Sequence, residues 1–393
     1  MSHHFPQEKS LAFRRRCLRC LSHLLLIGIL FPLAVVAGEM DELLQMDIQQ
    51  LMRLDVGITS ANKRSQKLHE AASAIYVVTQ EEIRRTGAST IMEALRVVPG
   101  LTVSQINQSQ YAISARGFNR QFGSNKLLVL MDGRTIYSPS FSGVDWTRQD
   151  TVMEDIDRIE VIRGPGAALW GSNAVDGVIN IITKSSKDTD GVLASGGAGR
   201  VENGFGSLRF GGDVQKDFTY RVYGKYRDNG PGENETGAGG HDQKRLGQGG
   251  FRSDWQATVR DQFTFQGDFY EIDAQTDSPT RFSSFTPPVN QPFLASTFYT
   301  GSNFIGRWNR KLENDSSLAV QAYYDRARIE SSFPTDSIIN QADFESQYNF
   351  HVGSAQQLSA GFNYRYADLY SAPRFDLRPA NRSTELFGFF LHS

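Results

Sequence analysis

From residue 191 to residue 393, apolar and polar side chains alternate along the chain in runs of about ten residues. The clearest run places Phe218, Tyr220, Val222 and Tyr226 on one side, and Thr219, Arg221, Tyr223, Lys225 and Arg227 on the other. Similar runs cover residues 318–325 and 358–367. A period of two residues predicts β-strands with one apolar and one polar face, and we count roughly ten of them. A soluble β-sandwich and a transmembrane β-barrel both alternate in this way, so the pattern alone leaves both open.

The residues before this repeat carry signals of short helices and strands instead. Ala74–Val78 predicts a strand. Thr79 predicts a helix N-cap because Glu82 completes a capping box, and Gly87 ends the helix. The same pairing of threonine and glutamate recurs at residues 90–93, so a second short helix is expected there.

Further strands and a tight turn follow. Ala112–Arg116 predicts one strand, and Leu127–Met131 is a continuous apolar run that predicts another. Asp132-Gly133 favours a hairpin turn, after which Arg134–Tyr137 returns. Short helices mixed with short strands indicate a small α+β unit ahead of the alternating region.

The segment Ile156–Lys184 predicts a strand, a glycine-rich turn and a second strand. Ile159 and Val161 alternate with Arg158 and Glu160, which predicts a strand with one buried face. The turn lacks both the lysine-containing P-loop pattern and the three-glycine dinucleotide pattern. Nucleotide binding is therefore not indicated.

This segment closely resembles the end of the plug domain of TonB-dependent outer-membrane receptors. In that family the pattern I-x-R-I-E-V-I-R-G-P, followed by G-V-I-N-I-I-T-K, recurs just before the barrel. Ile91–Leu101 is similar to the family's I-x-x-A-L-x-x-V-P-G-L segment, and shorter matches occur at residues 113–118 and 128–134. The resemblance implies an α+β plug domain, a small mixed sheet with short helices, followed by an antiparallel transmembrane β-barrel. Because barrels of this family have about 22 strands, roughly ten strands predict an incomplete barrel, and we expect a fragment or a truncated product.

In such a barrel, the breaks between the alternating runs are expected to be the loops and turns that connect the strands. Asn229–Gly240 is glycine-rich, and Asp277–Ser296 contains prolines and aromatic residues. Outer-membrane barrels have long extracellular loops and short periplasmic turns. We therefore expect these two breaks to be external loops, and the short polar break Glu313–Ser316 to be a periplasmic turn.

The N-terminus and the resemblance divide the chain into four segments. Residues 1–37 predict a signal peptide, because arginines at residues 14–16 precede the apolar run Leu24–Val36 and small residues favour cleavage after Ala37. An uncleaved anchor is the alternative. The other segments are a periplasmic N-terminal segment (residues 38–70), the plug (residues 71–187) and the first part of the barrel (residues 188–393).

The periplasmic N-terminal segment carries a candidate partner site. In the resembled family this position holds the TonB box, a short extended segment that pairs strand to strand with TonB of the inner-membrane energising complex. The candidate residues are Val56, Gly57, Ile58, Thr59, Ser60 and Ala61. Because such boxes are degenerate in sequence, a plain linker explains the same residues equally well.

The resemblance also implies roles for two arginines and two loops of the plug. Arg116 and Arg163 are expected to face the barrel wall and to pair with glutamates on later strands, beyond residue 393; without the resemblance they are ordinary surface arginines. The candidate ligand-facing residues are Asn119, Arg120, Gln121, Phe122, Tyr137 and Phe141. Alternatively, the side chains of these loops only pack the plug against the barrel.

Composition and motifs exclude several other functions. A net charge of −2 gives no electrostatic case for nucleic-acid binding. The two cysteines, Cys17 and Cys20, precede the predicted cleavage site. The histidines after that site are scattered without ligand spacing, so neither a metal site nor a cofactor is predicted. No G-x-S-x-G or H-E-x-x-H motif occurs, and we predict that the protein is not an enzyme.

Taken together, these features predict a receptor of the cell outer membrane that takes up a scarce ligand actively. The resemblance implies a ferric siderophore or another metal chelate as cargo, with haem or cobalamin next. It also implies TonB as the energising partner and outer-membrane lipid around the barrel. A passive porin-like channel, a non-functional truncated receptor and a periplasmic enzyme built on the α+β region remain as alternatives.

Overall fold

The computed structural model describes residues 57–58, 66–67, 74–115, 126–140, 143–164, 170, 173–233, 239–278, 282–285, 288–290, 293–331, 336–353, 356–372 and 380–392. All of them belong to one compact unit, residues 57–393. The predicted signal peptide and its alternative, an uncleaved anchor, lie outside the described residues. Within the described part of the chain, no helix is both long enough and apolar enough to cross a membrane.

A five-stranded mixed sheet forms the centre of the predicted plug, and we call the described residues between 74 and 189 the plug region. The sheet order is β3 (Ala74–Thr79), β10 (Ile156–Arg163), β11 (Gly177–Thr183), β6 (Leu127–Met131) and β7 (Arg134–Thr135). β10 pairs antiparallel with both of its neighbours, whereas β11 pairs parallel with β6. The mixed sheet expected from the resemblance is thus confirmed.

Two short helices begin where the sequence predicts them. The N-cap Thr79 accepts a hydrogen bond from the Glu82 backbone N–H at 3.2 Å, and α4 (Gln80–Thr86) ends at Gly87 in a left-handed conformation with φ of 67°. Thr90 caps α5 (Ile91–Ala94) in the same way. Local side-chain chemistry therefore fixes both helix starts.

The remaining short elements connect these parts. They are β1 (Gly57–Ile58) paired with β2 (Gln66–Lys67), α5 continued by η2 (Leu95–Val97), the hairpin of β4 (Leu101–Gln105) and β5 (Tyr111–Ala115), β8 (Tyr137–Ser138) paired with β9 (Gly143–Val144), η3 (Trp146–Arg148), η4 (Met153–Asp155), η5 (Ser186–Thr189), and β17 (Phe282–Phe285) paired with β18 (Pro288–Asn290).

The prediction that β10 has a single buried face is wrong. Ile159 and Val161 lie in the main apolar core of the plug region. Ile162 packs in a second apolar cluster. Glu160 is fully buried as well, and its carboxylate pairs with Arg158 at 2.8 Å. Because a second cluster contributes to its burial, β10 is a central strand buried on both sides, and the charged residues in its sequence conceal this.

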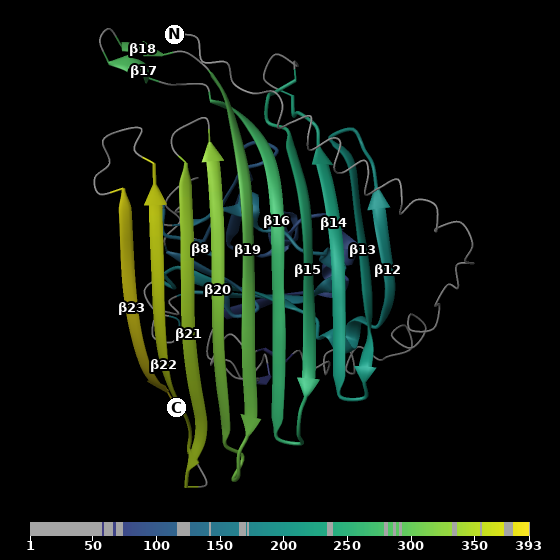
Figure 1. Ribbon diagram of the computed structural model, residues 1–393, viewed down its shortest axis with the longest axis vertical. Coiled ribbons are helices and arrows are strands. Elements are labelled where there is room, and N and C mark those ends of the chain that lie inside the picture. The colour runs from purple at the N-terminus through teal and green to yellow at the C-terminus, as the bar shows by residue number, and fades with distance from the viewer. Residues whose placement is uncertain are drawn as a thin grey trace, which may run out of the picture. The chain divides into compact units, whose positions relative to one another are not determined.

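Ten long antiparallel strands form the second part of the unit (Figure 1). In sheet order they are β12 (Gly191–Gly197), β13 (Glu202–Gln215), β14 (Phe218–Asn229), β15 (Lys244–Gln256), β16 (Asp261–Ser278), β19 (Phe293–Lys311), β20 (Ser317–Ser331), β21 (Ser337–Val352), β22 (Gln356–Ser371) and β23 (Asn381–His392). This confirms the predicted antiparallel strands, and β12 and β23 form the two edges of the sheet.

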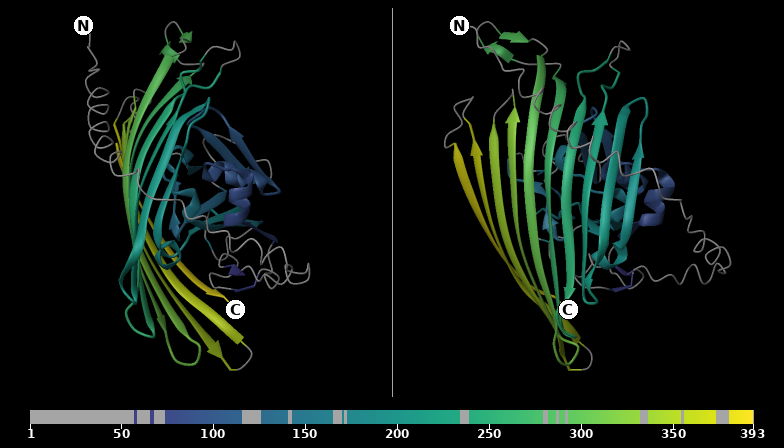
Figure 2. Two further views of the ribbon diagram at one scale, coloured as in Figure 1. Left: turned by 90° about the vertical axis from the view of Figure 1, so that its right-hand side faces the viewer. Right: turned by 45° about the vertical axis from the view of Figure 1, so that its right-hand side comes forward.

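The two faces of this sheet are inverted relative to a soluble β-sandwich. On β14, Arg221, Lys225 and Arg227 are buried, whereas Tyr220 and Val222 are exposed. Figure 2 shows the sheet curving around the plug region, which lies on its concave side. A soluble sandwich would bury the apolar face, so this arrangement supports the barrel interpretation.

The connections between the long strands follow the predicted breaks. β14 and β15 are joined by the glycine-rich break, and the segment after β16 holds the small β17–β18 hairpin. The polar break between β19 and β20 is a tight turn in which Asn314 and Asp315 both have φ of 54°. Short residues with positive φ suit a hairpin turn of this kind.

Some aromatic rings on the sheet lie directly over a glycine of the neighbouring strand. Tyr270 on β16 is paired with Gly301 on β19, and a Cβ atom added to Gly301 would overlap the tyrosine ring. Phe390 on β23 covers Gly361 on β22 in the same manner. A side chain larger than hydrogen does not fit at Gly301 unless the ring moves, and at Gly361 it would also meet the Ser346 carbonyl oxygen.

Candidate functional site

The candidate site is the interface between the plug region and the polar face of the ten-stranded sheet. Three plug aspartates, Asp132, Asp150 and Asp155, are buried in it and meet cationic side chains of the strands. None of the three lies inside a strand: Asp132 is in a turn, Asp155 ends η4, and Asp150 is in the irregular connection between η3 and η4. Ion pairs and hydrogen bonds of these aspartates thus attach the plug region to the strands of the large sheet.

Asp150 is the centre of the first cluster. Its carboxylate accepts a hydrogen bond from the Lys225 ammonium at 2.7 Å and lies 4.0 Å from the Arg227 guanidinium. Lys225 also donates to the Thr151 carbonyl, and the Gln248 amide donates to the Asp150 carbonyl at 3.0 Å. Burial alone would raise the pKa of Asp150, but Lys225 and Arg227 hold this pKa below its ordinary value. The carboxylate is therefore charged when it is buried.

Asp132 forms the second cluster at the turn between β6 and β7. Its carboxylate accepts hydrogen bonds from the Thr183 N–H and hydroxyl, both at 2.8 Å, and from the Gln266 amide at 2.9 Å. Arg307 donates to the Asp132 carbonyl at 2.7 Å. Burial would raise the pKa of Asp132, but the Arg252 guanidinium and the Thr183 N–H lower it below its ordinary value.

Asp155 anchors the third cluster beside the end of β11. Its carboxylate pairs with Arg209 on β13 and lies 3.7 Å from the Arg221 Nε on β14. Arg221 also donates to the Lys184 carbonyl at 2.7 Å and to the Thr183 hydroxyl at 3.0 Å. The last strand of the plug sheet is thus held to the first strands of the large sheet.

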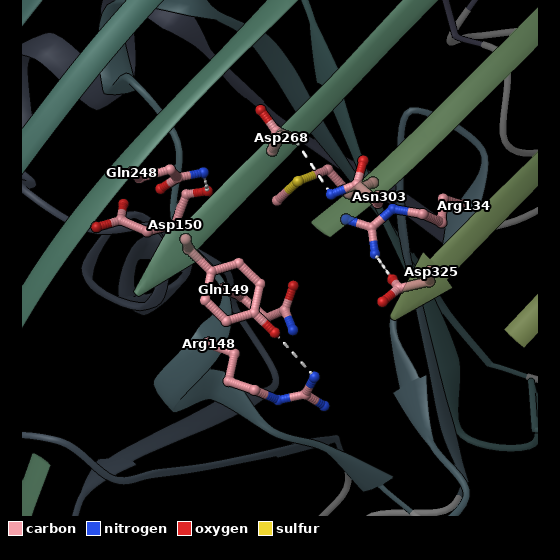
Figure 3. A pocket seen from close by; sticks show the side chains of 10 residues that line it. Arg134, Arg148, Gln149, Asp150, Gln248, Asp268, Asn303 and Asp325 are labelled. Carbon is pink, nitrogen blue, oxygen red and sulfur yellow. Dashed lines mark hydrogen bonds and ion pairs between the residues drawn. The ribbon is translucent and has the colours of Figure 1, made fainter. Parts of the chain in front are cut away.

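A small cavity lies beside Asp150 and Gln248 of the first cluster, with a volume of about 20 Å³ (Figure 3). Arg134 pairs with Asp325 on one side of it, and Arg148 donates to the Tyr270 hydroxyl at 3.1 Å on another. The Gln248 Oε1 atom is buried and accepts no hydrogen bond from the residues that the structure describes. A cavity of this size has room for about one water molecule, so it cannot hold a metal chelate.

Energetically, such an interface differs from an apolar contact. Completed ion pairs contribute little net stability because of their desolvation cost, whereas removal of one partner costs about 3–5 kcal/mol. Polar groups can exchange a protein partner for water when an interface opens, which apolar side chains cannot do favourably. The arrangement can therefore hold the plug region in place and still permit its release.

Several residues singled out from the sequence lie outside the described residues. They are Val56, Thr59, Ser60 and Ala61 of the candidate TonB box, Arg116, and the loop residues Asn119, Arg120, Gln121, Phe122 and Phe141. Gly57 and Ile58 form β1, which pairs antiparallel with β2. Partner binding by this segment stays a prediction.

Two other predicted residues are described. Arg163 ends β10 and donates to the Pro99 carbonyl at 3.3 Å. Tyr137 begins β8, pairs with Val144 and is half-buried. Pairing of Arg163 with a barrel glutamate and contact of Tyr137 with a ligand both stay predictions. Among the described residues, no group of three or more His, Cys, Asp or Glu side chains is arranged to hold a metal ion.

Reasoning from the sequence missed the three interface aspartates. In the sequence, Asp132 stands out only as a hairpin residue, and Asp150 and Asp155 belong to no motif. The cationic residues of β14 were recognised as a polar face, which is the one signal that pointed to this interface. Their partners are far away in sequence, so no local pattern could reveal them.

Comparison with known proteins identifies the plug region. Residues 67–178 match the family described as the TonB-dependent Receptor Plug Domain. This chain carries a TonB-dependent receptor plug domain. The match confirms the family resemblance read from residues 156–184, and with it the predicted outer-membrane location.

Curated relatives match a part of this chain. The vitamin B12 transporter BtuB of Vibrio vulnificus (strain CMCP6) is 38% identical over 151 residues, which is 38% of this chain and 24% of that protein. A ferric enterobactin receptor of Pseudomonas aeruginosa is 29% identical over 215 residues, 50% of this chain and 28% of the relative. The chain thus spans about a quarter of the length of the curated relatives it matches.

Solved structures confirm the fold over a longer stretch. The siderophore receptor PirA from Pseudomonas aeruginosa superposes with a TM-score of 0.60 at 22% identity, covering 81% of this chain and 52% of that chain. A ferric enterobactin receptor from the same organism, in complex with enterobactin, gives a TM-score of 0.61 at 17% identity and covers 81% and 55%. A plug followed by barrel strands is therefore the fold of this chain.

Proposed function

We propose that this chain acts in a TonB-dependent outer-membrane receptor that takes up a scarce ligand actively, with a ferric siderophore as its cargo. The observation that carries the proposal is the plug region, which fills the concave side of the sheet and is held there by buried ion pairs. A filled sheet with a releasable plug suits gated uptake. The names of the relatives, which include siderophore receptors and a vitamin B12 transporter, support cargo of this kind.

In the proposed mechanism, the ligand binds on the side of the long loops and TonB engages the segment Val56–Ala61. Gly57 and Ile58 already adopt a strand conformation, which suits strand-to-strand pairing with a partner. A pull on this segment would strain the plug region and expose its aspartates and their cationic partners to water. The ligand would then pass along the polar face of the sheet.

The proposal is tested by uptake into bacteria that carry the gene for this chain. Ferric enterobactin and vitamin B12 are offered to cells with and without TonB, and to cells without the gene. We expect saturable uptake of the ferric siderophore that requires both the gene and TonB. Uptake that proceeds equally well without TonB would support the passive porin-like channel instead, and absence of both binding and uptake would support a non-functional receptor.

A variant separates the proposed partner segment from a plain linker. Ile58→Pro removes a backbone N–H from β1 and prevents strand pairing. We expect it to abolish uptake while ligand binding to the cell surface is retained. Ile58→Val keeps the backbone N–H and serves as the matched control, with uptake close to that of the unaltered chain. Normal uptake by Ile58→Pro would assign Val56–Ala61 to a linker.

A further inference from the structure

The hairpin of β4 and β5 ends in an apex, residues 106–110, that is fixed by its own side chains. The Asn107 Oδ1 atom accepts hydrogen bonds from the Ser109 N–H at 2.9 Å, the Ser109 hydroxyl at 3.0 Å and the Gln110 N–H at 2.8 Å. A side-chain amide that bonds the backbone two residues on mimics a turn. The conformation of the apex is therefore fixed by hydrogen bonds within the apex itself.

This apex meets the connection between β14 and β15 at one carboxylate. Asp242 accepts a hydrogen bond from the Gln108 N–H of the apex at 3.0 Å through one oxygen. Through the other oxygen it accepts one from the Gly232 N–H of its own loop at 2.7 Å. A Cβ atom on Gly232 would come within 3.1 Å of the carboxylate, so this close approach suits glycine. One side chain thus joins two segments that are 134 residues apart.

A second set of hydrogen bonds, through Thr147 of η3, connects the apex with the start of β15. Lys244, which follows Asp242 by two residues, is buried and donates to the Thr147 carbonyl at 2.8 Å. The Thr147 hydroxyl in turn donates to the Ser109 carbonyl at 2.9 Å in the apex. Apex, η3 and loop therefore form a closed circuit of hydrogen bonds. While these hydrogen bonds are intact, a displacement of the loop is transmitted to the apex.

We propose that Asp242 is a positioning residue that couples the described ends of the β14–β15 loop, residues 230–233 and 239–243, to the plug apex, so that a ligand that displaces these residues changes the state of the plug. The coupling itself is a property of the folded chain, while its use in uptake rests on the function proposed above. A carboxylate is suited to the role because charge-assisted bonds to N–H groups are about twice as strong as neutral ones. The bonds also break singly, so the coupling is reversible.

The first test measures hydrogen exchange of the purified full chain in detergent. Asp242→Ala removes the acceptor of both N–H groups, and we expect peptides covering residues 106–110 and 230–233 to exchange about tenfold faster or more. Asp217→Ala is the matched control, because Asp217 is an exposed aspartate in the β13–β14 turn. Unchanged exchange in β15 and β16 shows that the variant is folded. Unchanged exchange at Gln108 in Asp242→Ala would overturn the proposal.

The second test asks for coupling rather than for a local bond. Asn107→Ala loosens the apex alone, and the exchange of residues 230–233 and 239–243 is then followed. With Asp242 present we expect the loop to exchange several-fold faster, and in the double variant with Asp242→Ala we expect no additional effect of Asn107→Ala. A loop that ignores Asn107→Ala in the presence of Asp242 would show that the two segments only touch.

A third measurement connects the coupling to uptake. Whole cells carrying Asp242→Asn are given ferric enterobactin, and binding and uptake are measured separately. We expect uptake to fall about tenfold while binding changes less than twofold, because one of the two bonds is lost. Equal loss of binding and uptake would assign Asp242 to ligand binding instead. If the unaltered chain takes up no probe at all, the proposed function fails, whereas the exchange experiments still decide the coupling.

Discussion

The core of the plug region and its interface with the large sheet are both buried, but they are built from opposite chemistry. The core consists of side chains such as Ile159, Ile179 and Leu95, which are fully removed from water. The interface consists of aspartates facing lysines, arginines and amides. Apolar burial is non-directional and is lost as soon as two surfaces separate. We therefore expect the core of the plug region and its contacts with the sheet to respond differently to substitution.

The largest effect on the interface is expected when one partner of a deeply buried ion pair is removed. Asp150→Ala leaves Lys225 buried without its carboxylate, with Arg227 close by. We expect a loss of about 3–5 kcal/mol in the free energy of unfolding, measured by urea titration in detergent. The double variant Asp150→Ala/Lys225→Met removes both charges and should recover most of this loss. An unchanged unfolding midpoint in Asp150→Ala would show that the pair is not desolvated.

The matching challenge to the core is Ile159→Ala. Because Ile159 is fully buried, the cavity should cost about 2–5 kcal/mol in the free energy of unfolding, and Ile159→Val about 0.5–1.5 kcal/mol. Hydrogen exchange should accelerate in β3, β10 and β11. In contrast to Asp150→Ala, a second substitution at Lys225 should give no recovery. Recovery would mean that core and interface are not separate.

Acid should loosen the interface and spare the core. The pKa values of Asp132 and Asp150 both lie below their ordinary value in the folded chain. Their stabilising effect is therefore fully present above the unfolded pKa of about 3.9 and is lost as pH falls through the lower folded values. We expect unfolding midpoints that are flat from neutral pH to about 5 and then decline. Asp132→Asn should flatten this decline, and an equally steep decline in that variant would contradict the assignment.

The smallest expected effect is local and belongs to neither region. Thr79→Ala removes the N-cap of α4, which should cost about 1 kcal/mol, whereas Thr79→Ser keeps a capping hydroxyl and should be close to neutral. Exchange should accelerate only in residues 80–86. Faster exchange across the whole interface would show that α4 supports the plug's attachment.

These regions also differ in how far the sequence predicts them. The start of α4 at Thr79 and its end at Gly87 depend on neighbouring residues, and both were predicted. The alternation of β14 is predicted for the same reason, because successive side chains of a strand point to opposite faces of the sheet.

Contacts between distant segments were out of reach. Asp150 and Lys225 are 75 residues apart, and no sequence pattern near either residue predicts that the two form an ion pair. The error on β10 has the same origin, because its second buried face depends on Leu128, Leu130 and Val178 from other strands. A single sequence thus predicts the secondary structure of a segment, but it does not predict which distant residues the segment contacts.

The rings that lie over glycines bear on how a long sheet finds its correct alignment. If β19 slipped by two residues against β16, Tyr270 would face Tyr299 or Asn303 instead of Gly301, and the ring would lose the space above the glycine that it now occupies. The pair of Phe390 and Gly361 imposes the same condition on the last two strands. Such pairs favour the observed register over shifted registers while the strands assemble. Anyone who exchanges single strands between related receptors should therefore transfer the ring and its glycine together.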